Sequence, residues 1–379
     1  MTARTSVVTV TPLLRFPEVR PGDDLADIVM KALQHNTIEL LDGDILVVSS
    51  KVASKALGLS APVASRDDMV LSQTVRVVAE RMTPFGPTRV VETVAGPVMA
   101  AAGVDASNTA DESIVLVLPD DPDAVAAEIL DGVQTGWATL SGRHVRLGVV
   151  LSDTAGRPWR IGQVDFALGA AGIRVVDDLR GSVDADGRTL WVTERCIADE
   201  IAAAADLVKG KATGVPVAHI RGLGQYVHHG QSKPGRSEPG ESATGARDLV
   251  RTGLGDWFGY GAFEAVRAAL GVEPGSATSD EIGIPSMGPE DVATRAGRAL
   301  RVALLHCPGV SGHVDGDTIH LAAEDGFALG VAATRAEVAL HGEGLATTLT
   351  RTRSPMPTPT AAPAKNGLTP HPSALIVFQ

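Results

Sequence analysis

Residues 148–172, GVVLSDTAGRPWRIGQVDFALGAAG, join a clear strand signal to a group of polar side chains. Residues 149–151 form an unbroken apolar run, which is typical of a strand buried on both faces. The run ends at the Ser-Asp-Thr of 152–154, and a glycine and a proline then predict a turn between Arg157 and Arg160. A carboxylate and hydroxyls at the exit of a buried strand, followed by arginines, suit a divalent cation that holds phosphate oxygens. In isolation, the same aspartate could simply cap a turn.

Two other groups of polar side chains follow predicted strands nearer the N-terminus. The strand predicted over 45–48 leads to Ser50, Lys51, Ser54 and Lys55. The strands predicted over 89–93 and 97–101 lead to Asp105, Ser107 and Asn108. Together with 152–160, these groups offer carboxylates for a divalent ion, cations for phosphates and an amide for a base or ribose. Each residue also has an ordinary alternative role, as a solvated lysine, a turn residue or a cap.

The composition narrows the class of protein. The 379 residues suggest two domains, or one large domain with an appendage, and 44% hydrophobic residues are enough for a buried core. Because aromatic residues make up only 3%, that core is expected to consist mainly of Val, Leu, Ile and Ala. The net charge of −12 argues against nucleic acid as the main partner, since binding a phosphate backbone needs clustered cations. A small phosphate-bearing ligand remains compatible with it.

Several common signals are absent from the sequence. Cys196 and Cys307 have no metal-ligand spacing and are interpreted as reduced. The chain shows no signal-peptide pattern and no apolar run of about 20 residues, which predicts a cytoplasmic protein that does not use a membrane. The standard P-loop, the GxGxxG dinucleotide loop that opens a helix and the GxSxG hydrolase elbow are also missing.

The remaining pattern predicts an α/β protein with mixed sheets. Strands are expected over 6–14, 114–118 and 215–220. Helices are expected over 25–33, 67–82, 122–129 and 197–208. Lys209 and Lys211 then complement the negative end of the last helix.

The chain is expected to divide into a main domain over 1–271, with a flexible insertion over 228–245, and a linker over 272–288. A small α/β module of unknown role follows over 289–350, with helices over 289–303 and 326–341 and a strand over 318–322. The Pro- and Thr-rich tail over 351–379 is expected to be mostly disordered.

Four strings in this order carry a family resemblance: SSKVASKALG, AAGVDASN, SDTAGRPWRIGQVDFALGAAG, and ADEIAAAADLVKGK with VPVAHIRG. They resemble the coenzyme F420-0:L-glutamate ligase family, the CofE type that also forms the N-terminal half of FbiB. The resemblance covers about residues 6–270. It implies an α/β (α+β mixed-sheet) ligase fold of two layers, here with a small C-terminal α/β appendage.

The resemblance also implies an activity. Family members use GTP to couple L-glutamate to the lactyl carboxylate of F420-0 and then add glutamates through γ-linkages. The partners implied are therefore F420-0, L-glutamate and GTP, with a homodimer as the assembly. The implied route is an acyl phosphate that the glutamate amine attacks, and it needs no nucleophile from the protein.

Site residues follow from the same resemblance. The GTP-contacting positions are Phe16, Pro17, Glu18, Val19, Ser50, Lys55 and Asn108. Asp105 and Asp153 are expected to bind one metal ion and Thr154 a second. The ions are Mg²⁺ or Mn²⁺, with K⁺ as a further candidate.

Two departures from the family pattern stand out. Some members carry Gln or Glu near Lys211 as a further metal contact, and the lysine of this chain puts that ligand in doubt. The C-terminal 100 residues or so are too short and too poor in aromatics to resemble the flavin-binding half of FbiB. Two alternatives remain open, namely an amide ligase of the same fold with another carboxylate acceptor, and a nucleotide-binding regulator without turnover.

Overall fold

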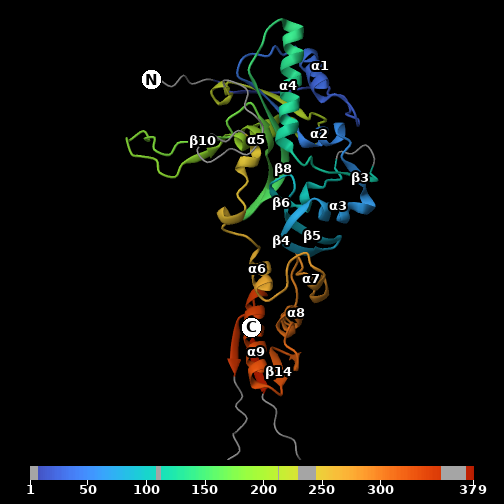
Figure 1. The fold of residues 1–379 in the computed structure, drawn as a ribbon, viewed down its shortest axis with the longest axis vertical. Coiled ribbons are helices and arrows are strands. Elements are labelled where there is room, and N and C mark those ends of the chain that lie inside the picture. The colour runs from blue at the N-terminus through green and yellow to red at the C-terminus, as the bar shows by residue number, and fades with distance from the viewer. Residues whose placement is uncertain (1–6, 108–111, 212, 229–244, 351–372) are drawn as a thin grey trace, which may run out of the picture. The chain divides into compact units, whose positions relative to one another are not determined.

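The computed structural model describes residues 7–107, 112–211, 213–228, 245–350 and 373–379 (Figure 1). Its contacts divide the chain into two compact units. Unit 1 comprises Met1–Val75 and Glu92–Gly255, and unit 2 comprises Arg76–Val91 and Asp256–Gln379. In the described residues, no helix is both long enough and apolar enough to cross a membrane.

A five-stranded mixed sheet forms the centre of unit 1. Its strands are β1 (Thr9–Pro12), β12 (Val217–Arg221), β2 (Asp44–Ser49), β8 (Leu147–Arg157) and β9 (Arg160–Ala171), in that spatial order. Only β2 and β8 pair in parallel, whereas the other neighbours are antiparallel. The predicted mixed sheet is therefore confirmed.

Helices cover both faces of this sheet. α1 (Leu25–His35) and α4 (Pro122–Ser141) share a core with Leu46 and Val48, while α5 (Ile197–Lys209) shares another with Ile45 and Val47. Successive residues of a strand point to opposite faces, so the apolar run of β2 supplies both cores. The unit has three layers, and the expected two-layer arrangement was wrong.

α4 begins where the sequence predicted but is longer. Asp121 accepts a hydrogen bond from the Ala124 amide at 3.1 Å, and Pro122 occupies the first turn. The helix continues past residue 129 although glycines are weak helix formers. A Cβ atom on Gly132 would lie 2.5 Å from the Ala26 Cβ atom, so this glycine lets α1 and α4 pack closely.

The helix predicted over 67–82 is wrong in its second half. α3 (Arg66–Ser72) ends early, and β4 (Thr74–Thr83) follows it. The apolar residues that suggested a helical face, such as Leu71 and Val75, are exposed, whereas Val77 is buried at a strand position. β-branched residues at alternating positions favour the strand.

The rest of unit 1 consists of short elements. β3 (Ser60–Pro62) pairs with β7 (Ile114–Leu116), and β10 (Val176–Asp178) pairs with β11 (Glu194–Cys196). A third small sheet has the order β4, β5 (Gly86–Thr93), β6 (Val98–Ala100), and most residues of β4 and β5 belong to unit 2. α2 (Ser50–Ala56) follows β2 directly. The 3₁₀ helices are η1 (Val63–Ser65), η2 (Ala101–Gly103), η3 (Gly224–Tyr226), η4 (Ala246–Leu249) and η5 (Gly253–Gly255).

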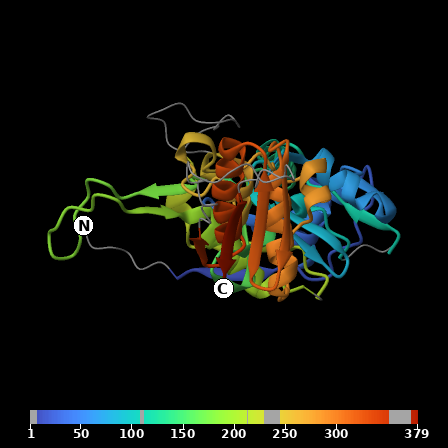
Figure 2. The ribbon, with the colours of Figure 1, turned by 90° about the horizontal axis from the view of Figure 1, so that it is seen from below.

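Unit 2 is an antiparallel sheet with helices packed on it. The sheet order is β13 (Val310–Asp315), β14 (Thr318–Ala323), β16 (Ser373–Phe378), β15 (Thr347–Thr350), as the orange and red strands of Figure 2 show. The helices are α6 (Ala262–Ala269), α7 (Ala277–Ile282), α8 (Val292–Leu304) and α9 (Gly326–Gly342). The predicted helices over 289–303 and 326–341 and the strand over 318–322 are thus present.

Two sequence interpretations need correction here, and parts of two others cannot be compared with the described residues. The segment 272–288 contains α7, which Ser276 caps by accepting a hydrogen bond from the Ser279 amide, so it is not only a linker. Residues 373–378 form β16, which lies between β14 and β15, so the end of the chain is ordered. The residues 351–372 of the predicted tail, and 229–244 of the predicted insertion, lie outside the described residues.

Unit 2 also includes the outer part of the β4–β5 hairpin. Glu80 is 2% exposed and accepts hydrogen bonds from the Gly275 amide, at 3.1 Å, and from the Ser279 hydroxyl. The Glu264 carboxylate in turn accepts one from the Glu80 amide at 3.1 Å. The contact-based units therefore differ from the predicted limits of 1–271 and 289–350, and separate folding of those segments stays a prediction.

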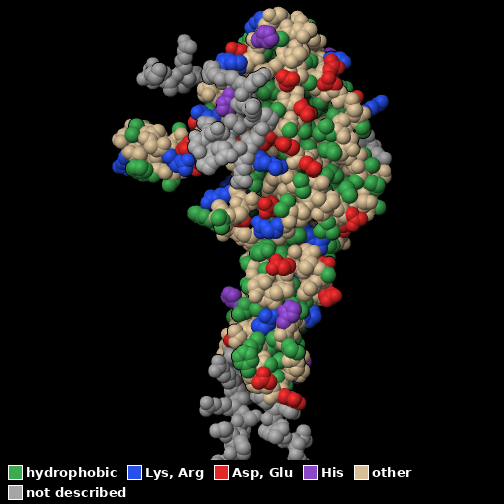
Figure 3. Space-filling model, viewed as in Figure 1, with side chains coloured by type: hydrophobic (Ala, Val, Ile, Leu, Met, Phe, Trp, Pro, Cys, Tyr) green, Lys and Arg blue, Asp and Glu red, His purple; other side chains and the backbone are tan. Residues whose placement is uncertain are grey.

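Charged side chains of both signs are interspersed over the described part of the face in Figure 3. That part of the surface has no continuous basic track of the kind that follows a nucleic-acid backbone.

Asp44 gives the fold a pH dependence. Burial raises the pKa of this carboxyl. Hydrogen bonds from Arg221 and His219 outweigh that effect and lower the pKa to about 2. Nε of Arg221 lies 2.8 Å from Oδ1 of Asp44, and Nη2 lies 2.7 Å from Oδ2. Because the unfolded value is 3.8, the charged form is favoured in the folded state. This stability is complete above pH 4 and is lost as the pH falls towards 2.

We expect Asp44→Asn to lower the free energy of unfolding by about 2 kcal/mol at neutral pH, from the size of the shift. Urea unfolding followed by circular dichroism should show the difference from the wild type shrinking between pH 5 and pH 2. Asp131→Asn, at an exposed position of α4, is the control. A difference that stays constant across this range would contradict the assignment.

Candidate active site

The predicted polar groups meet at the carboxyl ends of the two parallel strands. Ser49 at the end of β2 lies opposite Ser152 in β8. Because parallel strands end at the same edge of a sheet, the residues that follow them converge. α2 therefore places its first turn beside Asp153 and Thr154.

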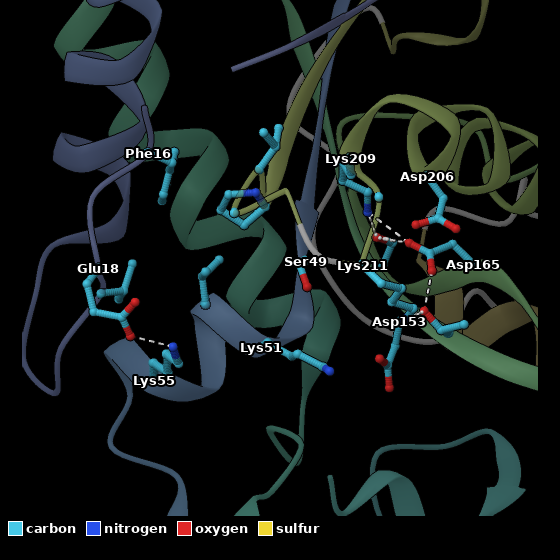
Figure 4. Close-up of a pocket in the computed structure, with 18 of the residues that line it drawn as sticks. Phe16, Glu18, Ser49, Lys51, Lys55, Asp153, Asp165, Asp206, Lys209 and Lys211 are labelled. Atoms are coloured by element: carbon cyan, nitrogen blue, oxygen red, sulfur yellow. Dashed lines mark hydrogen bonds and ion pairs between the residues drawn. The ribbon is translucent and has the colours of Figure 1, made fainter. Parts of the chain in front are cut away.

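A cavity of about 470 Å³ opens at this edge (Figure 4). This volume falls within the range of small-ligand sites. The loop before α1, the β2–α2 segment, the β8–β9 hairpin and the end of α5 all contribute side chains. The lining consists of Phe16, Pro17, Glu18, Val19, Ser49, Lys51, Val52, Lys55, Ser152, Asp153, Thr154, Asp165, Asp206, Lys209, Gly210, Lys211, Gly214, Val215 and Pro216.

Most of the predicted GTP-contacting residues line this cavity. The Lys55 ammonium lies 2.5 Å from Oε1 of Glu18, which joins α2 to the segment containing Phe16 and Pro17. Ser50 instead faces a smaller space of about 10 Å³ next to it. Asn108 lies outside the described residues.

Asp105 and Asp153 line the same small space, although they are far apart in sequence. Both Ala101 and Ala102 adopt left-handed backbone (φ 51° and 52°), a costly conformation that turns the chain before Asp105. The backbone of Asp105 then exchanges hydrogen bonds with Leu116, at 3.1 and 2.8 Å. Strained backbone and this pairing fix the carboxylate at the cavity.

Lys51 connects the two aspartates. Its Nζ lies 2.5 Å from Oδ2 of Asp105, and its charge also acts on Asp153. In Figure 4 the side chains of Lys51 and Asp153 point towards the same region. Two carboxylates thus share one ammonium.

The pKa values of these carboxyls differ. Burial raises the pKa of Asp153 to about 6, and the Thr154 amide and Lys51 offset this only in part. Burial also raises the pKa of Asp105, but hydrogen bonds from Lys51 and the Ser107 amide outweigh it and the net pKa is lowered. The charge of Asp153 is therefore incompletely compensated by the protein.

The donor set around this space fits a hard divalent cation. Ser50 Oγ is buried beside the Asp153 carboxyl, whose pKa it helps to lower, so a third oxygen lies at this space. Among the described residues, no group of three or more His, Cys, Asp and Glu side chains is placed to hold a metal. Magnesium commonly binds through one or two carboxylates together with substrate phosphates and water, and Asp105 and Asp153 match that pattern.

Thr154 has a different environment. Its hydroxyl donates to Oδ1 of Asp165 at 2.5 Å and accepts a hydrogen bond from the Lys211 ammonium. The other carboxylate oxygen of Asp165 lies 2.8 Å from Nζ of Lys209 and accepts a hydrogen bond from Ser152 at 3.0 Å. We call Thr154, Asp165, Lys209 and Lys211 the lysine cluster.

Sequence reasoning missed the site roles of Asp165, Asp206 and Lys209. From the sequence, Lys209 was interpreted only as a complement to the end of α5, and Lys211 was noted in addition as a departure from the metal contact of some family members. Lys209 is in fact 4% exposed and paired. Asp165 lies directly opposite Thr154 in the β8–β9 register, so alternation across the hairpin could have indicated it.

The two arginines of the hairpin do not join the site. β8 continues past Thr154, so Arg157 and Arg160 lie at the turn, exposed and outside the cavity lining. Three further strand residues carry Arg157 about 10 Å away. The expectation that these arginines lie behind the site was wrong.

Known proteins share much of this sequence. The chain matches the family described as F420-0:Gamma-glutamyl ligase over residues 13–67 and 62–222, which together cover more than half of it. The coenzyme F420:L-glutamate ligase of Methanothermobacter thermautotrophicus is 38% identical over 237 residues, 58% of this chain and 91% of the relative.

Two further relatives are also named coenzyme F420:L-glutamate ligase. That of Halobacterium salinarum is 35% identical over 268 residues, 65% of this chain and 97% of its own. That of Haloarcula marismortui is 32% identical over 262 residues, 64% of this chain and 95% of its own. This chain, with its site at the carboxyl edge of β2 and β8, belongs to the F420-0:gamma-glutamyl ligase family.

Proposed function

We propose that this chain ligates L-glutamate to the lactyl carboxylate of coenzyme F420-0 and then extends the product through γ-linkages, using GTP. The observation that carries the proposal is the meeting of Asp105 and Asp153 at one space, next to a 470 Å³ cavity lined by four lysines. The names of the relatives supply the acceptor and the amino acid.

In the proposed first step, an oxygen of the acceptor carboxylate attacks the γ-phosphorus of GTP. The bond to the bridging oxygen breaks, and GDP leaves with that electron pair. Lys51 and Lys55 donate hydrogen bonds to phosphate oxygens, which orients the triphosphate and balances its charge. A divalent cation held by Asp105 and Asp153 would stabilise the charge that develops on the transferring phosphoryl group.

In the second step, the glutamate amine attacks the acyl carbon of the acyl phosphate. Inorganic phosphate leaves, the amine loses its proton, and an amide remains. The cavity walls from Phe16 to Val19 and from Gly214 to Pro216 would limit the access of water to this intermediate, which is prone to hydrolysis.

The remaining parts of the proposal concern the protein's setting. On the basis of the family resemblance, we also propose that the enzyme uses K⁺ as an additional ion, forms a homodimer and is located in the cytoplasm. The exposed Trp159 and Ile161 side chains at the β8–β9 turn are compatible with burial in an assembly. Light scattering of the full chain tests the dimer.

The first prediction concerns the products. Purified protein with F420-0, L-glutamate, GTP and Mg²⁺ or Mn²⁺ should yield GDP and a product heavier by one or more glutamyl units. Mass spectrometry measures the gain, with ATP in place of GTP as the nucleotide control.

A panel of other carboxylate acceptors separates this function from an amide ligase of different specificity. If folded protein binds nucleotide but gives no mass gain on any acceptor, the regulator without turnover becomes the better interpretation.

The second prediction concerns Asp153→Asn. The substitution removes one anionic ligand of the divalent cation that stabilises the transferring phosphoryl group. We expect kcat/KM to fall by about 10²–10³-fold, which is the size found for single electrostatic contacts in active sites. Because burial disfavours the charged form of Asp153, the metal-free variant should unfold at the same or a higher temperature than the wild type.

Asp131→Asn, on the exposed face of α4, is the matched control and should change neither quantity. Full activity of Asp153→Asn would remove this residue from the metal site. Loss of activity with a large drop in thermal stability would indicate a structural role instead.

A further inference from the structure

The two sides of the cavity differ in charge balance. At the space between Asp105 and Asp153, two carboxylates face the single ammonium of Lys51, which leaves one net negative charge. A dication is attracted to such a site. The buried Ser50 hydroxyl, which lies beside Asp153, offers a further oxygen ligand there.

The lysine cluster has the opposite character. Lys211 donates to the Thr154 hydroxyl, and Lys209 forms an ion pair with Asp165 at 2.8 Å. Two ammoniums therefore lie around a single carboxylate. Even if Asp206 is counted, which also lines this side of the cavity, no net negative charge remains.

A second dication at Thr154 does not fit these residues. It would have to displace the Lys211 ammonium from the hydroxyl oxygen and stay close to two positive charges. Asp165 cannot compensate, because Lys209 and the Ser152 and Thr154 hydroxyls already occupy its oxygens. The expected second metal ion thus meets a cationic site.

We infer that Lys211 is a built-in cation that contacts the nucleotide phosphates in place of a second divalent ion. The active site then works with one dication, at Asp105 and Asp153. This inference rests on the proposed function, because it requires a nucleoside triphosphate in the cavity. An ammonium donates up to three hydrogen bonds and acts on phosphate as a point charge, which suits this position.

Lys211 is accessible to substitution without damage to the core. The residue is exposed, and it follows the end of α5. Its neighbour in the cluster, Lys209, is buried and paired, so changing Lys209 would disturb the fold. Substitutions at Lys211 therefore separate charge from stability.

The test is the number of Mn²⁺ ions bound to the full chain saturated with the β,γ-imido analogue of GTP. Electron paramagnetic resonance of free Mn²⁺ measures it without turnover. We expect one bound ion for the wild type and for Lys211→Arg. Lys211→Glu supplies a carboxylate beside Thr154, so this variant should bind a second Mn²⁺ ion. We expect its affinity for the second ion to be more than tenfold higher than that of the wild type for any second ion.

Two ions on the wild-type protein, or no second ion on Lys211→Glu, would overturn the inference. Thermal unfolding of each variant establishes that it is folded. Failure of the analogue to bind would overturn both this inference and the proposed function. The absence of a product from F420-0, with one Mn²⁺ still bound beside the nucleotide, would count against the acceptor alone.

Discussion

The parallel pairing of β2 with β8 is the constraint on which the site depends. It is the only parallel pair in the central sheet of unit 1, and its register sets Ser49 beside Ser152. Both strands are buried on both faces, so a shift by one residue would exchange the two cores. The packing of the sheet therefore also fixes which polar side chains meet at its edge.

Charge pairing then shapes the cavity. Each of the four lysines that line it has a defined oxygen partner, from Asp105, Glu18, Asp165 or Thr154. Ammonium groups held in this way need little reorganisation when an anionic ligand replaces water. The pairs also give the site two different sides. The side at Asp105 and Asp153 favours a bound cation, whereas the lysine cluster itself provides positive charge.

The apolar pattern predicted four strands of the central sheet, β1, β2, β8 and β12, and the helices α1 and α5, because each contains one clear pattern. It did not predict β9. It failed over 67–82, where the period changes from helix to strand within a few residues. It also failed for residues 373–378, whose strand is stabilised by pairing with β14 and β15 on either side. The apolar run of 374–378 is itself a strand signal, which the Pro- and Thr-rich composition of the preceding tail outweighed in the prediction.

By itself, the sequence determined the family and the chemical types at the site, since continuous strings such as SDTAGRPWRIGQVD carry both. It also indicated that Asp105 and Asp153 act together. Only the tertiary structure decided that Lys211 contacts Thr154, that Asp165 pairs with Lys209, and that Arg157 lies at the hairpin turn, outside the cavity lining. The physical reason is that these contacts depend on hairpin register and on where α5 ends against the sheet, and neither is encoded in a local pattern.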